Sequence, residues 1–293
     1  MNPLFKGLAA NDSKDLVCFI IMTLHDELNK VKKDSKINTS YTQIDQTNQQ
    51  LAFEYFFNSF INENNSLISD LFYAISTSTT QCSGCQTIKY NFQTYPVLIF
   101  PLEEVRKFKI EKMINQYMLY NQSIMNKNPK LYQQNLMNYQ KNCQNINSVN
   151  LDDCFLYYQK KECFEGENSI YCTKCHKLFP CCFQTFLFTV PNILIIILNR
   201  GKGRINEIKL EFNENLNLIN YVQKKETGYM YNLIGVVTYI GQGGPNAHFI
   251  AFCRSLINNR WYKYNDNSVT EIVNFQQEII DFGIPYILYY QKI

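Results

Sequence analysis

Two closely spaced cysteine pairs limit the folds open to this chain more than any other feature of its sequence. Cys82 and Cys85 form one Cys-x-x-Cys pair, and Cys172 and Cys175 form the other. Each pair places two thiolates on a tight turn, eased in the first by Gly84, and two such turns supply the four ligands of a tetrahedral structural zinc site. Strand-like sequence follows both turns, and a long insertion between them adds little closure entropy. The pattern predicts one structural Zn²⁺ in a zinc ribbon; the alternative is four unrelated thiols.

The neighbouring residues receive simpler interpretations. His176 follows Cys175 directly, and because four cysteines are already available, we expect it to lie on the surface beside the ribbon. Cys181 and Cys182 are adjacent, so on a strand they would point to opposite faces, and we expect core packing for both. The chain has 11 cysteines, an odd number, and no secretory signal is recognisable at its N-terminus. These features favour metal over disulfides and predict a cytoplasmic and/or nuclear location.

Composition narrows the classes of partner. Of the 293 residues, 46% are apolar, which is enough for a sizeable core, and only 18% are charged. A net charge of +3 without a basic block argues against nucleic acid and membrane surfaces as partners. The most apolar stretch, VPNILIIILNR at 190–200, is too short to cross a bilayer and predicts a buried strand. Partners must therefore be inferred from sites.

Periodicity predicts a mixture of helices and strands. Apolar residues recur every four positions over 12–30, which predicts an amphipathic helix, and a second helix is expected near 50–62. Residues 103–149 are rich in Asn, Gln and Tyr and have little periodicity beyond about residue 120. We expect that stretch to be a low-complexity insertion, partly disordered. The C-terminal third predicts several strands separated by Gly, Asn and Asp turns.

A second group of candidate residues lies near the C-terminus. His248 follows the glycine-rich segment GQGGPNA and opens a predicted strand, and Asp266 ends the next one after a turn at LINNR. An antiparallel hairpin would bring the two to the same end, where a carboxylate can hold an imidazole tautomer. From spacing alone, a structural histidine beside a turn aspartate is an equal alternative. His25 lies inside the first predicted helix, and we expect it to pack on the helix surface.

Five motifs, in order along the chain, together resemble the ubiquitin-specific protease family, the papain-like deubiquitinases. They are NDSKDLVCFIIMTLHDELN, SLISDLFYAISTSTTQCSGC, YCTKC with the later PNILIIILNR, YNLIGVVTYIGQGGPNAHFIAF with WYKYNDNSV, and PYILYYQK. The resemblance runs over nearly the whole length apart from the insertion. Small departures are Ala247, Phe249 and the LNRG that ends the core strand.

The resemblance implies an α+β, papain-like cysteine protease fold with thumb, palm and fingers. Residues 1–293 would form one catalytic domain that lacks the N-terminal part of the thumb. Residues 66–102 and 171–190 would form the zinc-ribbon fingers, and 103–149 the insertion. The implied partners are ubiquitin and ubiquitinated proteins.

The resemblance also implies roles for single residues. His248 would be the general base and Asp266 its orienting carboxylate. Asp12 and Asp15, at the family's acidic helix positions, would bind the arginines of ubiquitin's tail, since carboxylates form charge-assisted pairs with guanidinium groups.

The family's box around the nucleophilic cysteine and its oxyanion-hole Asn have no counterpart here, and none of the 11 cysteines fits the role of nucleophile. Two interpretations stay open: a deubiquitinase whose nucleophile lies outside this chain, and an inactive ubiquitin-binding module. A zinc-ribbon scaffold without a role in ubiquitin binding is the weakest alternative.

Overall fold

The computed structural model describes most of the chain. The described residues are 13–31, 45–201, 208–224, 228–241 and 248–293. The helices are α1 (Ser13–Leu28), α2 (Gln49–Glu63), α3 (Leu67–Phe72), α4 (Leu102–Tyr120), α5 (Gln122–Lys127), α6 (Pro129–Gln144) and α7 (Leu151–Tyr158). The strands are β1 (Ala74–Cys82), β2 (Ile88–Tyr95), β3 (Leu98–Pro101), β4 (Ser148–Asn150), β5 (Glu162–Phe164), β6 (Ile170–Cys172), β7 (Lys177–Phe179), β8 (Cys181–Leu187), β9 (Ile193–Asn199), β10 (Lys209–Glu211), β11 (Asn215–Asn217), β12 (Met230–Ile240), β13 (His248–Arg254), β14 (Trp261–Asn265), β15 (Ser268–Glu271) and β16 (Ile284–Lys292). The α+β class predicted from the sequence is confirmed.

A large sheet forms the centre of the molecule. Its strands follow the order β15-β14-β13-β12-β16-β9-β3, and β11 pairs with β12 as an eighth strand. The predicted buried strand at 190–200 is β9, in the interior of this sheet. Its residues alternate between two apolar clusters: Ile195 and Ile197 pack with Ile21 of α1, while Ile196 and Leu198 pack on the opposite face. All four β9 residues are at most 1% exposed, and each stabilises the fold by about 1.5–3 kcal/mol.

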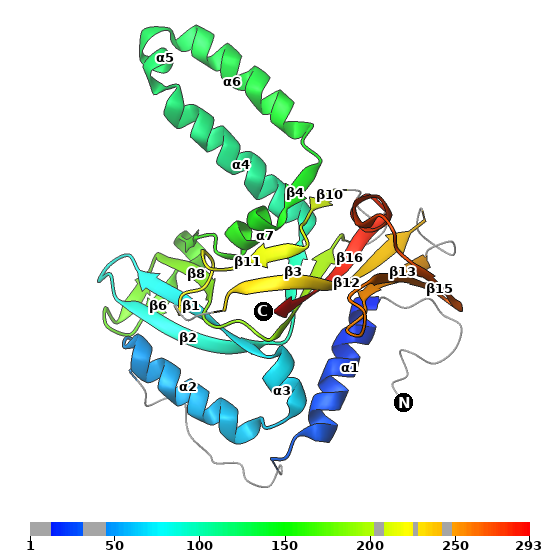
Figure 1. Ribbon diagram of the computed structural model, residues 1–293. Helices are drawn as coiled ribbons and strands as arrows, with labels where there is room; N and C mark the ends of the chain where they lie inside the picture. The colour runs from blue at the N-terminus through cyan, green and yellow to red at the C-terminus, as the bar shows by residue number, and fades with distance from the viewer. Residues whose placement is uncertain (1–12, 32–44, 202–207, 225–227, 242–247) are drawn as a thin grey trace.

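A smaller sheet extends to one side of the large one, and we call it, with the ribbon beside it, the fingers (Figure 1). Its strand order is β2-β1-β8-β5, and the separate two-stranded ribbon β6–β7 lies next to it. The fingers are shorter at one end than predicted for 66–102, because β3 pairs in parallel with β9 in the large sheet. Pro96 lies between β2 and β3 and, lacking an N–H donor, cannot continue the β2 ladder.

The two predicted N-terminal helices are confirmed. The side chain of Asn48 caps α2 by accepting a hydrogen bond from the backbone N–H of Leu51. On α1, Ile21 is buried against the large sheet, whereas Leu16 and Ile20 are 42% and 44% exposed. The helix therefore buries a narrower face than the sequence pattern predicts. Among the described residues no helix has the length and apolarity needed to cross a membrane.

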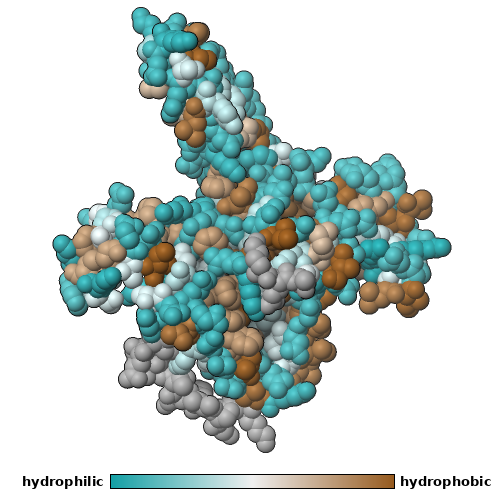
Figure 2. Space-filling view, turned by 60° about the vertical axis from the view of Figure 1, so that its left-hand side comes forward, coloured by the Kyte–Doolittle hydropathy of each residue, from teal (hydrophilic) through white to brown (hydrophobic). Residues whose placement is uncertain are grey.

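The insertion is ordered, and the prediction of partial disorder over 103–149 was wrong. It forms α4, α5 and α6, a helical arm that leaves the body and folds back on itself (Figure 1). Tyr117 and Tyr139 stack between the two long helices with ring centroids 4.3 Å apart, and Tyr132 is buried. Asn128 caps α6, and Pro129 occupies its first turn, a favoured position for proline. The outer surface of the arm is mostly hydrophilic, with scattered apolar residues (Figure 2).

Candidate functional site

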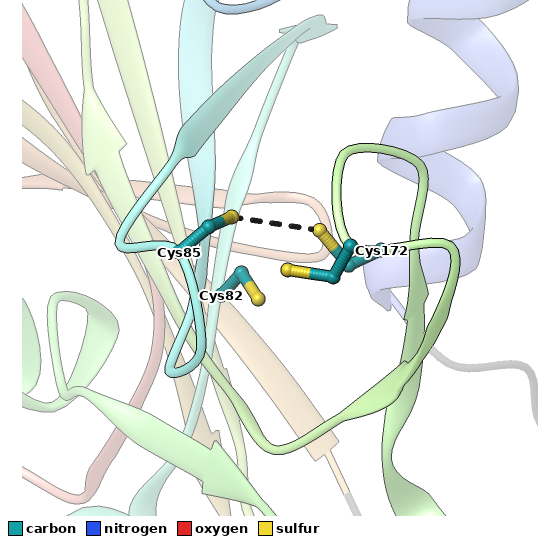
Figure 3. A group of neighbouring side chains, drawn as sticks. Cys82, Cys85 and Cys172 are labelled. Carbon is teal, nitrogen blue, oxygen red and sulfur yellow. Dashed lines mark hydrogen bonds between the residues drawn. The ribbon is translucent and has the colours of Figure 1, made fainter.

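The two cysteine pairs meet in the fingers. The sulfur atoms of Cys82, Cys85, Cys172 and Cys175 all lie within 4.8 Å of one another, and the Cys85 and Cys172 Sγ atoms are 3.6 Å apart (Figure 3). Zinc–sulfur bonds of about 2.3 Å in a tetrahedron place the sulfurs about 3.8 Å apart. The arrangement therefore fits a four-thiolate zinc site, and the prediction that these cysteines come together is confirmed.

The two turns that carry the cysteines have matching backbones. In the first, the N–H of Gln86 donates to the Cys82 carbonyl, and in the second the N–H of His176 donates to the Cys172 carbonyl, both at 2.9 Å. Gln86 and His176 have φ angles of 57° and 54°. In each pair the donor lies four residues after the acceptor. The two cysteine pairs are therefore held by turns of the same type. Two such turns facing one another form a preorganised ligand set.

Glycine is required at one position of the first turn for packing reasons. A Cβ atom added to Gly84 would lie 2.7 Å from the ring of Phe179, on the ribbon strand β7. The next residue back, Ser83, bonds to the carbonyl of Pro180 through both its N–H and its hydroxyl. The first turn is thus held directly against the ribbon and the start of β8.

The thiols differ in how readily they ionise. The hydroxyl of Thr87, 3.2 Å from the Cys85 sulfur, lowers the pKa of Cys85 to about 6, and a backbone hydrogen bond from Cys175 lowers the pKa of Cys172. Burial among the other thiols raises the pKa of Cys175 to about 12. A metal needs all four as thiolates, so its binding would release protons from this cluster.

The other residues near the cluster have structural positions. His176 is exposed and is not among the grouped ligands, as predicted. Cys181 is buried, 3% exposed, which confirms core packing. Cys182 is not a core residue: it forms a disulfide with Cys163. That prediction was wrong because β5, which the sequence pattern did not indicate, places Cys163 directly opposite Cys182.

The second candidate site lies at the end of the hairpin formed by β13 and β14. His248 Nε2 is 2.6 Å from Asn265 Oδ1 and 3.8 Å from Asp266 Oδ2. The histidine and the aspartate do meet, as predicted, but the hydrogen bond is made by Asn265, which the sequence analysis overlooked. Asp266 has φ 49° and a side chain that is 80% exposed. It therefore lies at the turn after β14, at ion-pair distance from the imidazole.

This hydrogen bond determines the imidazole tautomer. An amide oxygen can only accept, so Nε2 donates its proton to Asn265, and in the neutral ring Nδ1 then keeps a lone pair. Nδ1 has no hydrogen-bond partner among the described residues. A histidine held in this way can take a proton at Nδ1. No hydrogen bond or ion pair of His248 within the described residues involves a cysteine, and Cys253, on the same strand, points to the opposite face because its offset is odd.

Of the remaining candidate residues, Asp15 and His25 lie within the described structure and Asp12 does not. Asp15 is exposed in the first turn of α1. Asp12, Ala247 and the glycine-rich segment before His248 lie outside the described residues. His25 is buried rather than on the helix surface: its ring nitrogens lie 2.8 Å from Ser66 Oγ and 2.9 Å from Asn64 Oδ1. It joins α1 to the start of α3 and belongs to the structural framework.

Comparison with known proteins decides the family. The model of the ubiquitin carboxyl-terminal hydrolase family matches residues 1–290. The chain belongs to this family. It is 23% identical over 300 residues to ubiquitin carboxyl-terminal hydrolase 2 of Bos taurus, covering 99% of this chain and 41% of that protein. It is 21% identical over 287 residues to ubiquitin carboxyl-terminal hydrolase Usp2 of Drosophila melanogaster, covering 96% of this chain and 26% of that protein. The chain thus spans less than half the length of these hydrolases.

Solved structures of DUB modules share the fold. The yeast SAGA DUB module with an Sgf73 mutant superposes with a TM-score of 0.61 at 19% identity, over 96% of this chain and 50% of that one. The Ubp8/Sgf11/Sus1/Sgf73 DUB module bound to ubiquitin aldehyde gives a TM-score of 0.59 at 19% identity, over 97% of this chain and 50% of that one. The predicted fold, that of a ubiquitin-specific protease, is confirmed.

Proposed function

We propose that this chain is the ubiquitin-gripping and base-supplying part of a deubiquitinase. The reaction is thiol-dependent hydrolysis of peptide and isopeptide bonds at the C-terminal glycine of ubiquitin. The observation that carries the proposal is the His248–Asn265 hydrogen bond of 2.6 Å, which leaves Nδ1 able to accept a proton, on the scaffold of this family.

His248 acts as the general base in this proposal. Its Nδ1 takes the proton of a cysteine thiol that lies outside this chain, and the resulting imidazolium later returns a proton to the leaving amine. Asn265 holds the ring in place by accepting from Nε2–H. Asp266 Oδ2, 3.8 Å from Nε2, stabilises the positive charge that develops on the ring. In this proposal Asn265 orients the ring, which the sequence resemblance had implied for Asp266. Asp266 contributes its negative charge instead.

The proposed partners are ubiquitin and proteins conjugated to it. Asp15 projects from the first turn of α1, where its charge is exposed, and the sequence resemblance assigns it, with Asp12, to the arginines of ubiquitin's tail. Exposed carboxylates of this kind form charge-assisted hydrogen bonds with guanidinium groups. Solved DUB modules of similar fold, bound to ubiquitin aldehyde and to monoubiquitin, support ubiquitin as the partner by similarity.

We also propose Zn²⁺ as the metal of the four-cysteine cluster. Bound there, it would contribute no reacting group and would serve as a crosslink between the β1–β2 turn and the β6–β7 turn. The chain's own residues prepare the site: Thr87 favours the Cys85 thiolate, and the matched turns aim four sulfurs inward. All ligands are thiolates and all positions are filled by protein, which is typical of structural rather than catalytic zinc.

A titration with isotope-labelled ubiquitin tests the proposed function. Adding the 293-residue chain should broaden or shift the amide signals of ubiquitin's C-terminal tail. Ubiquitin that lacks the tail is the matched control and should bind at least about tenfold more weakly, because charge-assisted pairs in the tail are lost. Equal affinity for the two forms, or unchanged spectra at millimolar protein, would contradict a deubiquitinase that presents this tail to His248.

A further inference from the structure

The disulfide between Cys163 and Cys182 joins strands β5 and β8 of the fingers, next to the ribbon. Cys163 lies at the centre of β5 and Cys182 directly opposite it on β8. The chain leaves the sheet after β5, forms the ribbon β6–β7 and returns to the sheet at β8. The disulfide therefore joins the two stems of the ribbon at the point where they leave the sheet.

The loop closed by this disulfide carries half of the metal cluster. Cys163 and Cys182 are 19 residues apart in sequence, and Cys172 and Cys175 lie between them. β6 and β7 form a two-stranded sheet of their own and pair with no other strand of the described structure. The stems, together with the contacts of the first turn with Phe179 and Pro180, help to position this second cysteine pair.

The disulfide is also accessible from solvent. β5 is an edge strand, held to β8 by three residue pairs, and Cys163 is exposed. The remaining cysteines are free thiols. A lone exposed disulfide beside free thiols can be reached by small thiol reagents, unlike a buried structural one, and exposed disulfides are typically the labile ones.

We propose that Cys163 and Cys182 are a redox-operated clamp that controls how tightly the ribbon holds its half of the metal cluster. In oxidation, the Cys163 thiolate attacks a low-molecular-weight disulfide such as oxidised glutathione, forming a mixed disulfide and releasing one glutathione thiolate. The Cys182 thiolate then attacks the Cys163 sulfur and releases the second. Two protein thiols lose two electrons and two protons, and one glutathione disulfide becomes two glutathione thiols. Reduction by glutathione runs the same steps in reverse.

The clamp acts through the freedom of the ribbon. When the bond is closed, the short loop confines Cys172 and Cys175 opposite Cys82 and Cys85, so a metal that loses one ligand is quickly bound again. When it is open, the three residue pairs of β5 can separate and the ribbon can move away. This inference rests on the proposed zinc site for its metal readout but not on the deubiquitinase reaction.

Zinc release from the 293-residue chain measures the effect. Zinc-loaded protein is prepared with oxidised or with reduced glutathione, and transfer of zinc to 4-(2-pyridylazo)resorcinol is followed. The oxidised protein should release zinc roughly three- to tenfold more slowly than the reduced protein. Peptide mapping after alkylation should locate the oxidised pair at Cys163 and Cys182. Equal release rates, or a different bonded pair, would overturn the clamp.

Matched variants separate the clamp from general oxidation. Cys163→Ser and Cys182→Ser should each bind zinc and release it at the reduced wild-type rate under both conditions. Cys253→Ser, which removes an exposed thiol outside the fingers, should behave as wild type. Redox dependence that persists in Cys163→Ser would place the effect on the metal ligands and reject the proposal.

Hydrogen exchange of residues 165–180 gives a readout without metal. If no zinc binds in either state, the zinc assignment fails, and slower exchange in the oxidised protein still decides for or against the clamp.

Discussion

In the proposed site, His248 has two polar neighbours that divide the two tasks a single carboxylate performs in a Ser-His-Asp triad. The neutral amide of Asn265 orients the His248 ring, because its Oδ1 is 2.6 Å from Nε2, but it adds no charge. The charge comes from Asp266, 3.8 Å away and largely in solvent, where water weakens the attraction. Orientation should therefore depend mainly on Asn265, and stabilisation of the imidazolium mainly on Asp266.

Replacing these two neighbours should have different effects on the tautomer of neutral His248. Asn265→Ala removes the acceptor for Nε2–H, so the ring should populate both tautomers. Asp266→Asn leaves that acceptor in place, so the Nε2–H form should persist. The ¹⁵N chemical shifts of the His248 ring report the tautomer directly. A loss of the Nε2–H preference in Asp266→Asn but not in Asn265→Ala would restore the aspartate as the orienting group.

Asp15→Asn should weaken ubiquitin binding without weakening the fold. The side chain is exposed in the first turn of α1, where asparagine is tolerated, so the melting temperature should hardly change. Loss of one charge-assisted pair should lower the affinity for ubiquitin about tenfold at low salt, and less at moderate salt. Glu27→Gln, an exposed acid near the other end of the same helix, is the control and should bind normally. Equal loss in both variants would point to a general charge effect.

Sequence reasoning placed His248 near Asp266 and grouped the four cysteines, but it did not identify Asn265 as the hydrogen-bond partner of His248. Asn265 and Asp266 are adjacent, and the choice between them depends on where β14 ends. Asn265 is still paired with Ser268 in the sheet, whereas Asp266 has turned into left-handed backbone. His25 was misplaced for a similar reason: the two groups that bind it come from the segment before α3, far along the chain.

At the scale of elements, the fingers depend on two turns that face each other without belonging to one sheet. The β1–β2 turn is part of the four-stranded sheet, and the turn of β6–β7 belongs to the separate ribbon. Few strand hydrogen bonds connect them, so the metal would supply the missing link. Removing it should affect the fingers first and the large sheet least.

Cys172→Ser tests this link. The variant should lose most of its zinc, because one thiolate ligand is gone and the remaining three leave a position open. Metal analysis of purified protein should give about one zinc per chain for wild type and well under half for the variant. Hydrogen exchange should rise in β6 and β7 and stay unchanged in β9. Full zinc content in the variant would reject the four-cysteine assignment.

Gly84→Ala tests the packing of the first turn against the ribbon. The added Cβ would lie 2.7 Å from the Phe179 ring, so either the ring or the turn must move. We expect a loss of about 1–3 kcal/mol in the free energy of unfolding and faster zinc release. The double variant Gly84→Ala with Phe179→Leu, which makes room for the methyl group, should recover part of both. An unchanged single variant would mean that the ring moves aside freely.

The arm shows which elements sequence patterns predict poorly. The helix over 12–30 and the strand at 190–200 were predictable, because strong apolar patterns reflect burial against a sheet. The first turns of α4 enter the main core through Leu102 and Val105, but beyond them α4, α5 and α6 pack on one another, and stacked Tyr117 and Tyr139, helix caps and Tyr132 replace a broad apolar face. Such pairwise contacts leave little periodic signal in a stretch rich in Asn and Gln. The stretch therefore resembled disorder.

At the scale of the whole molecule, the fingers and the His248 hairpin lie at opposite ends of the body (Figure 1). The finger strands β2 and β8 lead into β3 and β9 of the large sheet, and β16 and β12 lie between β9 and the hairpin strand β13; the core residues of this sheet are almost fully buried. In the proposed function, this sheet would place folded ubiquitin at the fingers and its C-terminal tail near His248. The overall fold was predictable from the order of five motifs, whereas the extent of the fingers and the fold of the arm required the structure.

The central claim is that ubiquitin's C-terminus reaches His248. The most direct test uses ubiquitin with a photoreactive diazirine at its C-terminal end, mixed with the 293-residue chain and irradiated. We predict that the crosslinked peptides map to the β13–β14 hairpin between His248 and Asp266, and that excess unlabelled ubiquitin suppresses them. Crosslinks spread over unrelated surfaces, or concentrated on the arm, would contradict the proposed site.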